Sequence, residues 1–176
     1  GQPLSGRCLI FGAAIPSLTP MMMNPNLQIV QNESYVVVMT EMIHDARIIR
    51  LGKAHQDDGI NRWMGDSVGH WEGDALVVHS EHFRPEQSTS RMGFRVSEQF
   101  EVIEHYTLTS DETIHYRFTI NDPKAYGVPI SGERTLTRNP PEARLYDYEC
   151  HEGNYSLAAI LRGARMSEVR AELGRD

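Results

Sequence analysis

The chain lacks an apolar segment long enough to cross a membrane. None of its 176 residues belongs to an uninterrupted run of the roughly 18–20 apolar residues that a transmembrane helix requires. Basic residues are also in the minority, since 24 acidic residues outnumber 17 basic ones and the formal net charge is −7. This negative charge repels phosphate groups and anionic lipids, so we expect no nucleic-acid partner. The lack of a long apolar run predicts that the chain has no membrane span.

Cysteine is scarce as well, because only Cys8 and Cys150 occur, one near each end of the chain. A disulfide between them would enclose most of the sequence and, in the chain-entropy model, would stabilise the fold by up to about 5 kcal/mol. Two unrelated buried thiols fit the same spacing. The two residues by themselves therefore leave both alternatives open.

Strand-like patterns dominate what is present. Residues 1–28 are expected to be irregular because prolines interrupt every pattern there. β-Branched and aromatic runs then alternate with turn residues at 31–34, 72–74, 109–113 and 139–143. Helical spacing of apolar residues follows over about 155–173. We predict a single mainly β domain, an antiparallel barrel of about eight strands and lipocalin-like type, with a C-terminal α-helix.

The segment EMIHDAR at 41–47 is the first candidate for chemistry. Continued as a strand, it would place Asp45 and Arg47 on one face of a cavity wall. His44 would then be a general base and Arg47 would hold an anionic oxygen of a substrate. The alternative is a surface ion pair between Asp45 and Arg47, which contributes only about 0–1 kcal/mol.

Two further groups of residues extend the candidate site. Glu98 and Glu104 alternate with apolar residues, and burial inside a barrel would raise their pKa values, as a general acid requires. A solvated strand edge is the alternative. The stretch WMGDSVGHWEGD at 63–74 offers Trp63 and Asp66 as substrate-binding residues, although turn formation and plugging of a barrel end explain the same pattern.

Histidine is frequent, with eight in the chain, and the spacing of these residues decides whether a metal is expected. HSEH at 79–82 is not a recognised zinc spacing, and no H-E-x-x-H motif occurs. We therefore expect no metal and no other cofactor, with a metal-dependent barrel enzyme as an alternative. Isolated exposed histidines are the simplest explanation of the remainder, which comprises His55, His70, His79, His82, His105 and His115.

Several motifs together resemble a large family of uncharacterised bacterial proteins that usually carry secretion signals. The resemblance rests on EMIHDARII, RWMGDSVGHWEGDALVV, FTINDP and YECHEGNYSLAAILRGAR, and covers most of residues 7–165. It implies a secreted or periplasmic setting, with the signal peptide outside this chain, and a disulfide between Cys8 and Cys150. His70 and His79 depart from the family pattern, so the resemblance implies no shared substrate. It also marks a set of residues as important: His44, Asp45, Arg47, Trp63, Asp66, Trp71, Glu98, Glu104, Asp122, His151 and Glu152.

The functional prediction is a metal-free acid–base enzyme, a lyase, isomerase or hydrolase, acting on a small organic molecule inside the barrel. The predicted catalytic residues are His44, His151, Glu152, Glu104 and Arg47. The predicted substrate-binding residues are Asp45, Trp63, Asp66, Glu98 and Tyr116. A lipocalin-like binding protein is the alternative, and an aliphatic cavity with His44 and His151 outside it would favour this alternative. A homo-oligomer is compatible with either function.

Overall fold

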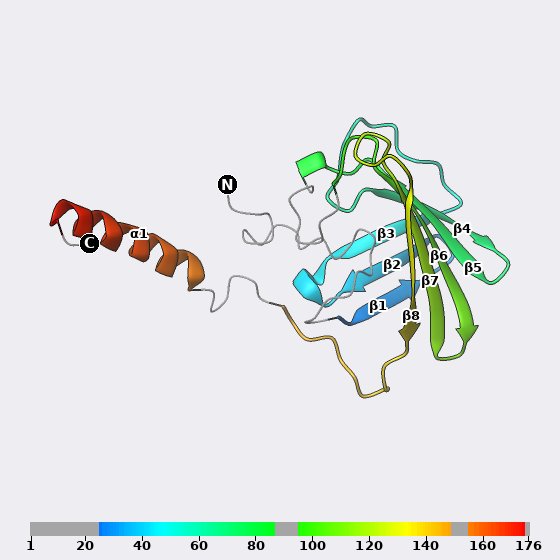
Figure 1. Ribbon diagram of the computed structural model, residues 1–176. Coiled ribbons are helices and arrows are strands. Elements are labelled where there is room, and N and C mark those ends of the chain that lie inside the picture. Colours follow the sequence, from blue (N-terminus) through cyan, green and yellow to red (C-terminus); the bar gives the residue numbers. More distant parts are fainter. Residues whose placement is uncertain (1–24, 87–94, 149–154, 175–176) are drawn as a thin grey trace.

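The computed structural model describes residues 25–86, 95–148 and 155–174. Its body is one eight-stranded sheet whose strands lie side by side in chain order. Figure 1 shows that the sheet curls into an open half-barrel with a concave and a convex face. The strands are β1 (Leu27–Gln31), β2 (Tyr35–Thr40), β3 (Ala46–Leu51), β4 (Asp66–Glu72), β5 (Ala75–Glu81), β6 (Glu101–Ser110), β7 (Thr113–Asn121) and β8 (Ile130–Thr137).

The predicted mainly β fold with eight strands and a C-terminal helix is confirmed, but the predicted closed antiparallel barrel is not found. Within the described residues, β1 pairs only with β2 and β8 only with β7, so no ladder joins the two edges. In addition, β3 and β4 are parallel, whereas the other neighbours are antiparallel. A side-chain hydrogen bond of 3.0 Å from Asn139 to Asn26 links the chain beyond the ends of the two edge strands.

The parallel pair places a long connection, residues 52–65, beside the sheet. Parallel neighbours need a crossover, because the chain must return to the end at which the previous strand began. This connection ends at Gly65, where φ is 66°. A Cβ atom at Gly65 would lie 2.6 Å from the ring of Phe83, so only glycine fits the backbone against that ring.

The predicted hairpin turns near 31–34, 72–74 and 109–113 are confirmed by the β1–β2, β4–β5 and β6–β7 pairs. The prediction of a strand through 41–45 is wrong. A 3-10 turn, η2 (Met42–His44), separates β2 from β3, and φ is positive at Ile43 and His44. The strand expected after 139–143 is also missing from residues 141–148, which the structure describes as a turn and irregular chain.

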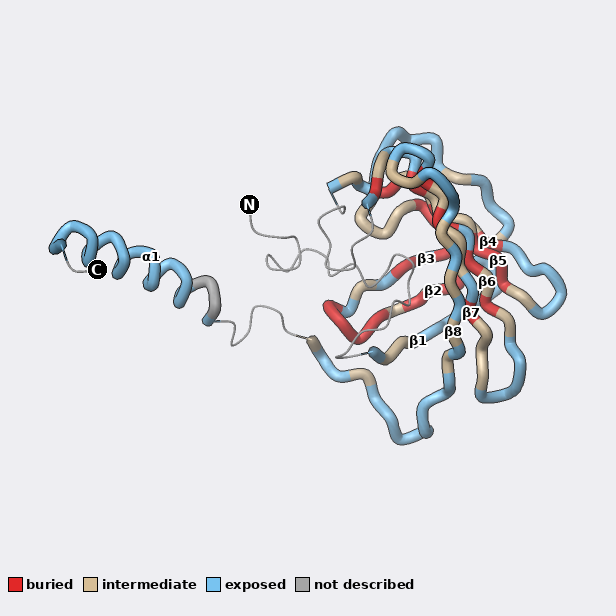
Figure 2. Tube along the Cα trace, in the orientation of Figure 1, coloured by how far each residue is buried: buried red, intermediate tan, exposed pale blue. Residues whose placement is uncertain are grey.

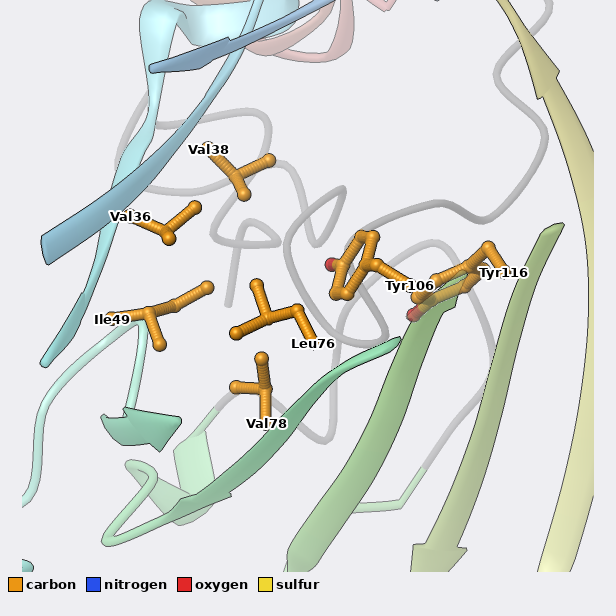
Figure 3. Close-up of a cluster of buried hydrophobic side chains, with 7 residues drawn as sticks. All are labelled: Val36, Val38, Ile49, Leu76, Val78, Tyr106 and Tyr116. Carbon is orange, nitrogen blue, oxygen red and sulfur yellow. The ribbon is translucent and has the colours of Figure 1, made fainter. Parts of the chain in front are cut away.

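Buried positions lie along β2 to β7 (Figure 2), and the apolar side chains among the buried residues form two clusters. In the first, residues from β2 and β3 face residues from β5, β6 and β7 (Figure 3). These residues share the concave face because every second side chain along a strand points to the same side of the sheet. The first cluster comprises Val36, Val38, Ile49, Leu76, Val78, Tyr106 and Tyr116. The second comprises Phe83, Val96, Phe100, Val102 and Ile120.

The C-terminal helix, α1 (Ser156–Glu172), confirms the helix predicted over about 155–173. It stands away from the sheet (Figure 1), and residues 158–172 are exposed. Several apolar side chains, including those of Ile160 and Leu161, are about half exposed. Among the described residues, no helix has both the length and the apolar character that a membrane span demands.

Candidate functional site

A pocket of about 590 Å³ opens on the concave face of the half-barrel. Most of its lining is aliphatic, and the side chain of Trp71 is half exposed at its edge. Polar side chains in the lining come from Gln31, Asp74 and the phenol of Tyr106. The lining residues are Ile29, Gln31, Val36, Val38, Trp71, Gly73, Asp74, Leu76, Tyr106, Leu108 and Ile114.

A buried polar cluster lies next to this pocket and is joined to it by Tyr106. On β6, the inward-facing residues run from Val102 in the second apolar cluster through Glu104 to Tyr106 in the pocket wall. Arg47 on β3 donates from Nη1 to Glu104 Oε2 over 2.5 Å and from Nη2 to Glu104 Oε1 over 3.1 Å. It also donates to the Tyr106 hydroxyl over 2.9 Å. The pocket is therefore separated from the second apolar cluster by a charged layer.

Two phenols complete the shell around the Glu104 carboxylate. Tyr116 on β7 donates its hydroxyl proton to Glu104 Oε1 over 2.7 Å, and Tyr106 donates to the same oxygen over 3.1 Å. Arg47, Glu104 and Tyr116 are almost fully buried. Burial of an ion pair is costly unless further hydrogen bonds compensate the charges, and here Tyr106 and Tyr116 add such hydrogen bonds to the pair.

The charges in this cluster reinforce one another. Burial disfavours the charged guanidinium of Arg47, but the adjacent Glu104 carboxylate outweighs that effect and raises the pKa of Arg47 above its usual range. Burial and the nearby Glu104 charge both raise the pKa of Tyr116, so its hydroxyl remains a hydrogen-bond donor. The arrangement favours a carboxylate held ionised by fixed donors over a proton-transferring acid.

Three of the predicted site residues, Arg47, Glu104 and Tyr116, thus come together beside the pocket, which Tyr106 connects to them. The structure places His44 and Asp45 elsewhere, in and just after the turn η2 between β2 and β3. His44 is exposed and does not line the pocket. Burial raises the pKa of Asp45 to about 6, although the nearby His44 acts in the opposite direction.

The other predicted substrate-binding residues lie away from the pocket. Trp63, in the 52–65 connection, stacks against the guanidinium of Arg84 at 4.8 Å. Glu98 is exposed and pairs with Lys124. Asp66 points to the convex face, where Arg50 donates to both of its carboxylate oxygens over 2.8 Å.

The remaining predictions lie outside the described residues. They are the catalytic roles of His151 and Glu152 and the disulfide between Cys8 and Cys150. These assignments stay predictions.

Sequence reasoning missed Tyr106, which links the buried ion pair to the pocket. The alternation of β6 carries a detectable signal, because Tyr106 shares the face of Glu104 two residues away. It also missed a histidine pair, His55 and His79, on the convex face. No spacing rule could have found that pair, since only the crossover connection brings His55 to β5.

No protein-family model, curated protein or solved structure matches this chain. The resemblance to secreted bacterial proteins stays a prediction from the motifs. Function is therefore argued from the geometry and chemistry of the site.

Proposed function

We propose that this protein binds one small, mainly apolar organic molecule in the concave pocket of its half-barrel. The observation that carries the proposal is a pocket of about 590 Å³ with an aliphatic lining and the phenol of Tyr106 in its wall. Small-molecule sites have volumes of roughly 300–1,000 Å³ and combine an apolar lining with a few placed polar groups.

The buried ion pair supports binding by fixing the position of Tyr106. Because its hydroxyl both accepts from Arg47 and donates to Glu104, the ring cannot turn without breaking both hydrogen bonds. Because the side chain is already fixed, it loses little further conformational entropy when a ligand binds against it. We expect the apolar body of the ligand to contact the aliphatic wall, with its polar end near Tyr106.

Binding is favoured over the acid–base enzyme predicted from the sequence. The Glu104 carboxylate is enclosed by hydrogen bonds from Arg47, Tyr106 and Tyr116, which stabilise its ionised form. His44 lies outside the pocket lining. An aliphatic cavity with His44 outside it is the arrangement expected of a lipocalin-like binding protein, whereas the contribution of His151 stays a prediction.

The proposal can be tested by titrating the protein with the neutral fluorophore N-phenyl-1-naphthylamine. We expect saturable binding of one molecule per chain. Replacing Leu108 in the pocket wall by lysine should weaken binding by at least about tenfold, because a bound apolar ligand would force the ammonium group to lose solvent.

Ile48→Lys is the matched control. Ile48 and Leu108 are both aliphatic strand residues with similar exposure, 57% and 55%, but Ile48 points to the convex face. Circular dichroism verifies folding of both variants, and Ile29→Lys provides a second pocket variant. Equal dye affinity in the Leu108, Ile29 and Ile48 variants would refute the pocket as the binding site.

A further inference from the structure

The convex face carries a line of imidazoles and carboxylates that the proposed ligand pocket does not use. His55 comes from the 52–65 connection, and His79 lies on β5. His55 Nε2 and His79 Nδ1 face each other at 2.9 Å. The outer nitrogens both meet carboxylates, since His55 Nδ1 lies 2.9 Å from Asp66 Oδ2 and His79 Nε2 lies 3.0 Å from Glu101 Oε2.

These contacts determine which nitrogens carry protons. An ionised carboxylate can only accept a hydrogen bond, so His55 Nδ1 and His79 Nε2 must be the donors. Asp66 Oδ2 already accepts a hydrogen bond from the Gln56 backbone N–H over 2.9 Å and one from Arg50 Nη2 over 2.8 Å. The same oxygen therefore acts as an acceptor towards His55 Nδ1.

A conflict follows at the centre of the pair. A neutral imidazole has one donor nitrogen, so once the outer nitrogens donate, His55 Nε2 and His79 Nδ1 are both left as bare acceptors. Two lone pairs facing each other at 2.9 Å repel, and the arrangement is stable only with a cation shared between them. That cation is a proton or a metal ion.

A third ligand and the local charge favour the metal ion. Glu81 lies two residues after His79 on the same face of β5, and each of His55, His79 and Glu81 offers a ligand atom within 4.8 Å of the other two. With Asp66 and Glu101, three carboxylates surround the imidazole pair, and Arg50 neutralises one of them. The remaining negative charge matches a divalent cation better than a single proton.

We propose that His55 Nε2, His79 Nδ1 and the Glu81 carboxylate bind a divalent transition-metal ion of the zinc type. Two imidazoles and one carboxylate form a ligand set that such ions accept, with a fourth position open to water. Tetrahedral zinc with Zn–N bonds of about 2.0–2.1 Å separates its two nitrogens by about 3.3 Å, so the rings need to part by only a few tenths of an ångström. Asp66 and Glu101 orient the two rings through their outer nitrogens, as carboxylates commonly do around zinc-bound histidines.

The fold holds this site independently of the concave pocket. Alternation on β5 sends His79 and Glu81 to the convex face and Leu76 and Val78 to the concave face. The metal proposal and the pocket proposal therefore stand or fall separately.

The test is titration of the full, chelator-treated protein with ZnCl₂ by calorimetry, and with Co²⁺ by visible absorption. We expect one Zn²⁺ per chain, and for Co²⁺ the intense d–d bands of a four- or five-coordinate site with nitrogen and oxygen ligands. His55→Ala and His79→Ala should remove this binding. Glu81→Gln, which keeps the shape of the side chain, should weaken it by at least about tenfold, and Asp66→Asn by about 10- to 100-fold.

His70→Ala and His115→Ala are the matched controls, because both histidines sit on outward-facing strand positions beside a carboxylate, Glu72 and Glu133 respectively. Neither substitution should change the zinc affinity. Failure of the wild-type protein to bind zinc would show that the imidazole pair shares only a proton and would overturn the proposal. A thiolate-to-cobalt charge-transfer band, or zinc binding that survives both His79→Ala and Glu81→Gln, would do the same.

Discussion

The charged clusters on the two faces of the half-barrel differ in how their charges are compensated. On the concave face, Arg47 and Glu104 form a closed ion pair whose carboxylate is surrounded by hydrogen-bond donors. On the convex face, His55 and His79 are partly exposed and bring two ring nitrogens within 2.9 Å of each other. In the first cluster each charge has an opposite charge beside it, whereas we infer that the second needs an added cation.

This difference shows why a buried charge cannot by itself be taken as a catalytic group. Glu104 is the most deeply buried acid of the sheet, yet the hydrogen-bond donors around it stabilise its ionised form. This environment disfavours a role for Glu104 as a general acid. The convex cluster is less buried but lacks internal compensation. For a cation, incomplete compensation of nearby charges indicates a binding place better than depth of burial does.

The largest expected effect comes from opening the closed cluster. Glu104→Gln would remove the counter-ion that Glu104 supplies to the buried Arg47 guanidinium, and we expect a loss of about 3–5 kcal/mol in the free energy of unfolding. Urea denaturation followed by circular dichroism measures this loss. The double variant Arg47→Met/Glu104→Leu should recover much of it, because two apolar side chains avoid the desolvation of charge. A single variant as stable as the wild type, or a double variant less stable than the single one, would contradict a structural role for the pair.

A smaller effect is expected at Asp45, which lies between η2 and β3, two residues before Arg47, and whose Oδ2 atom is buried with no hydrogen-bond partner. Burial raises the pKa of Asp45 from 3.8 to about 6, so the folded protein holds this proton more tightly than the unfolded chain. Its contribution to stability is therefore complete below about pH 4 and is lost as the pH rises through about 6.

Asp45→Asn should remove that dependence. The variant should be more stable than the wild type at pH 7, by up to about 3 kcal/mol, and the difference should vanish near pH 4. Chemical denaturation at a series of pH values between 4 and 7 measures it. Parallel stability profiles for the two proteins would show that the Asp45 carboxylate is not perturbed by folding.

The smallest effect is expected where an ion pair meets solvent. Glu98 pairs with Lys124 at the surface, and hydrogen bonding to that ammonium lowers the pKa of Glu98. Glu98→Gln should nevertheless leave the melting temperature unchanged within error, because water compensates an exposed charge. The same substitution at Glu104 is the comparison. A large loss at Glu98 would indicate that this region carries an interaction beyond the surface pair.

Sequence reasoning recovered most of the strands, because hairpins are local. The turns around Gly73 and Asp111 contain turn-forming residue types, which predict them directly. In the flanking strands, the alternation of apolar and polar residues predicts which side chains face inward. It failed at residues 41–45, where the 3-10 turn Met42–His44 has positive φ at Ile43 and His44 but contains no glycine, proline or asparagine. Apolar content alone could not separate this turn from a continuing strand.

Of the candidate site, the sequence by itself determined the chemistry available and the face on which each strand residue lies. Arg47, Glu104 and Tyr116 could be named in advance because ionisable and phenolic groups among apolar neighbours mark an inward position. Only the tertiary structure decided which of these groups meet. Arg47 and Glu104 are 57 residues apart, and the His55–His79 pair depends on a parallel crossover that no local pattern encodes. Contacts between distant segments follow from how the whole sheet curls and connects, and that is a property of the packed chain.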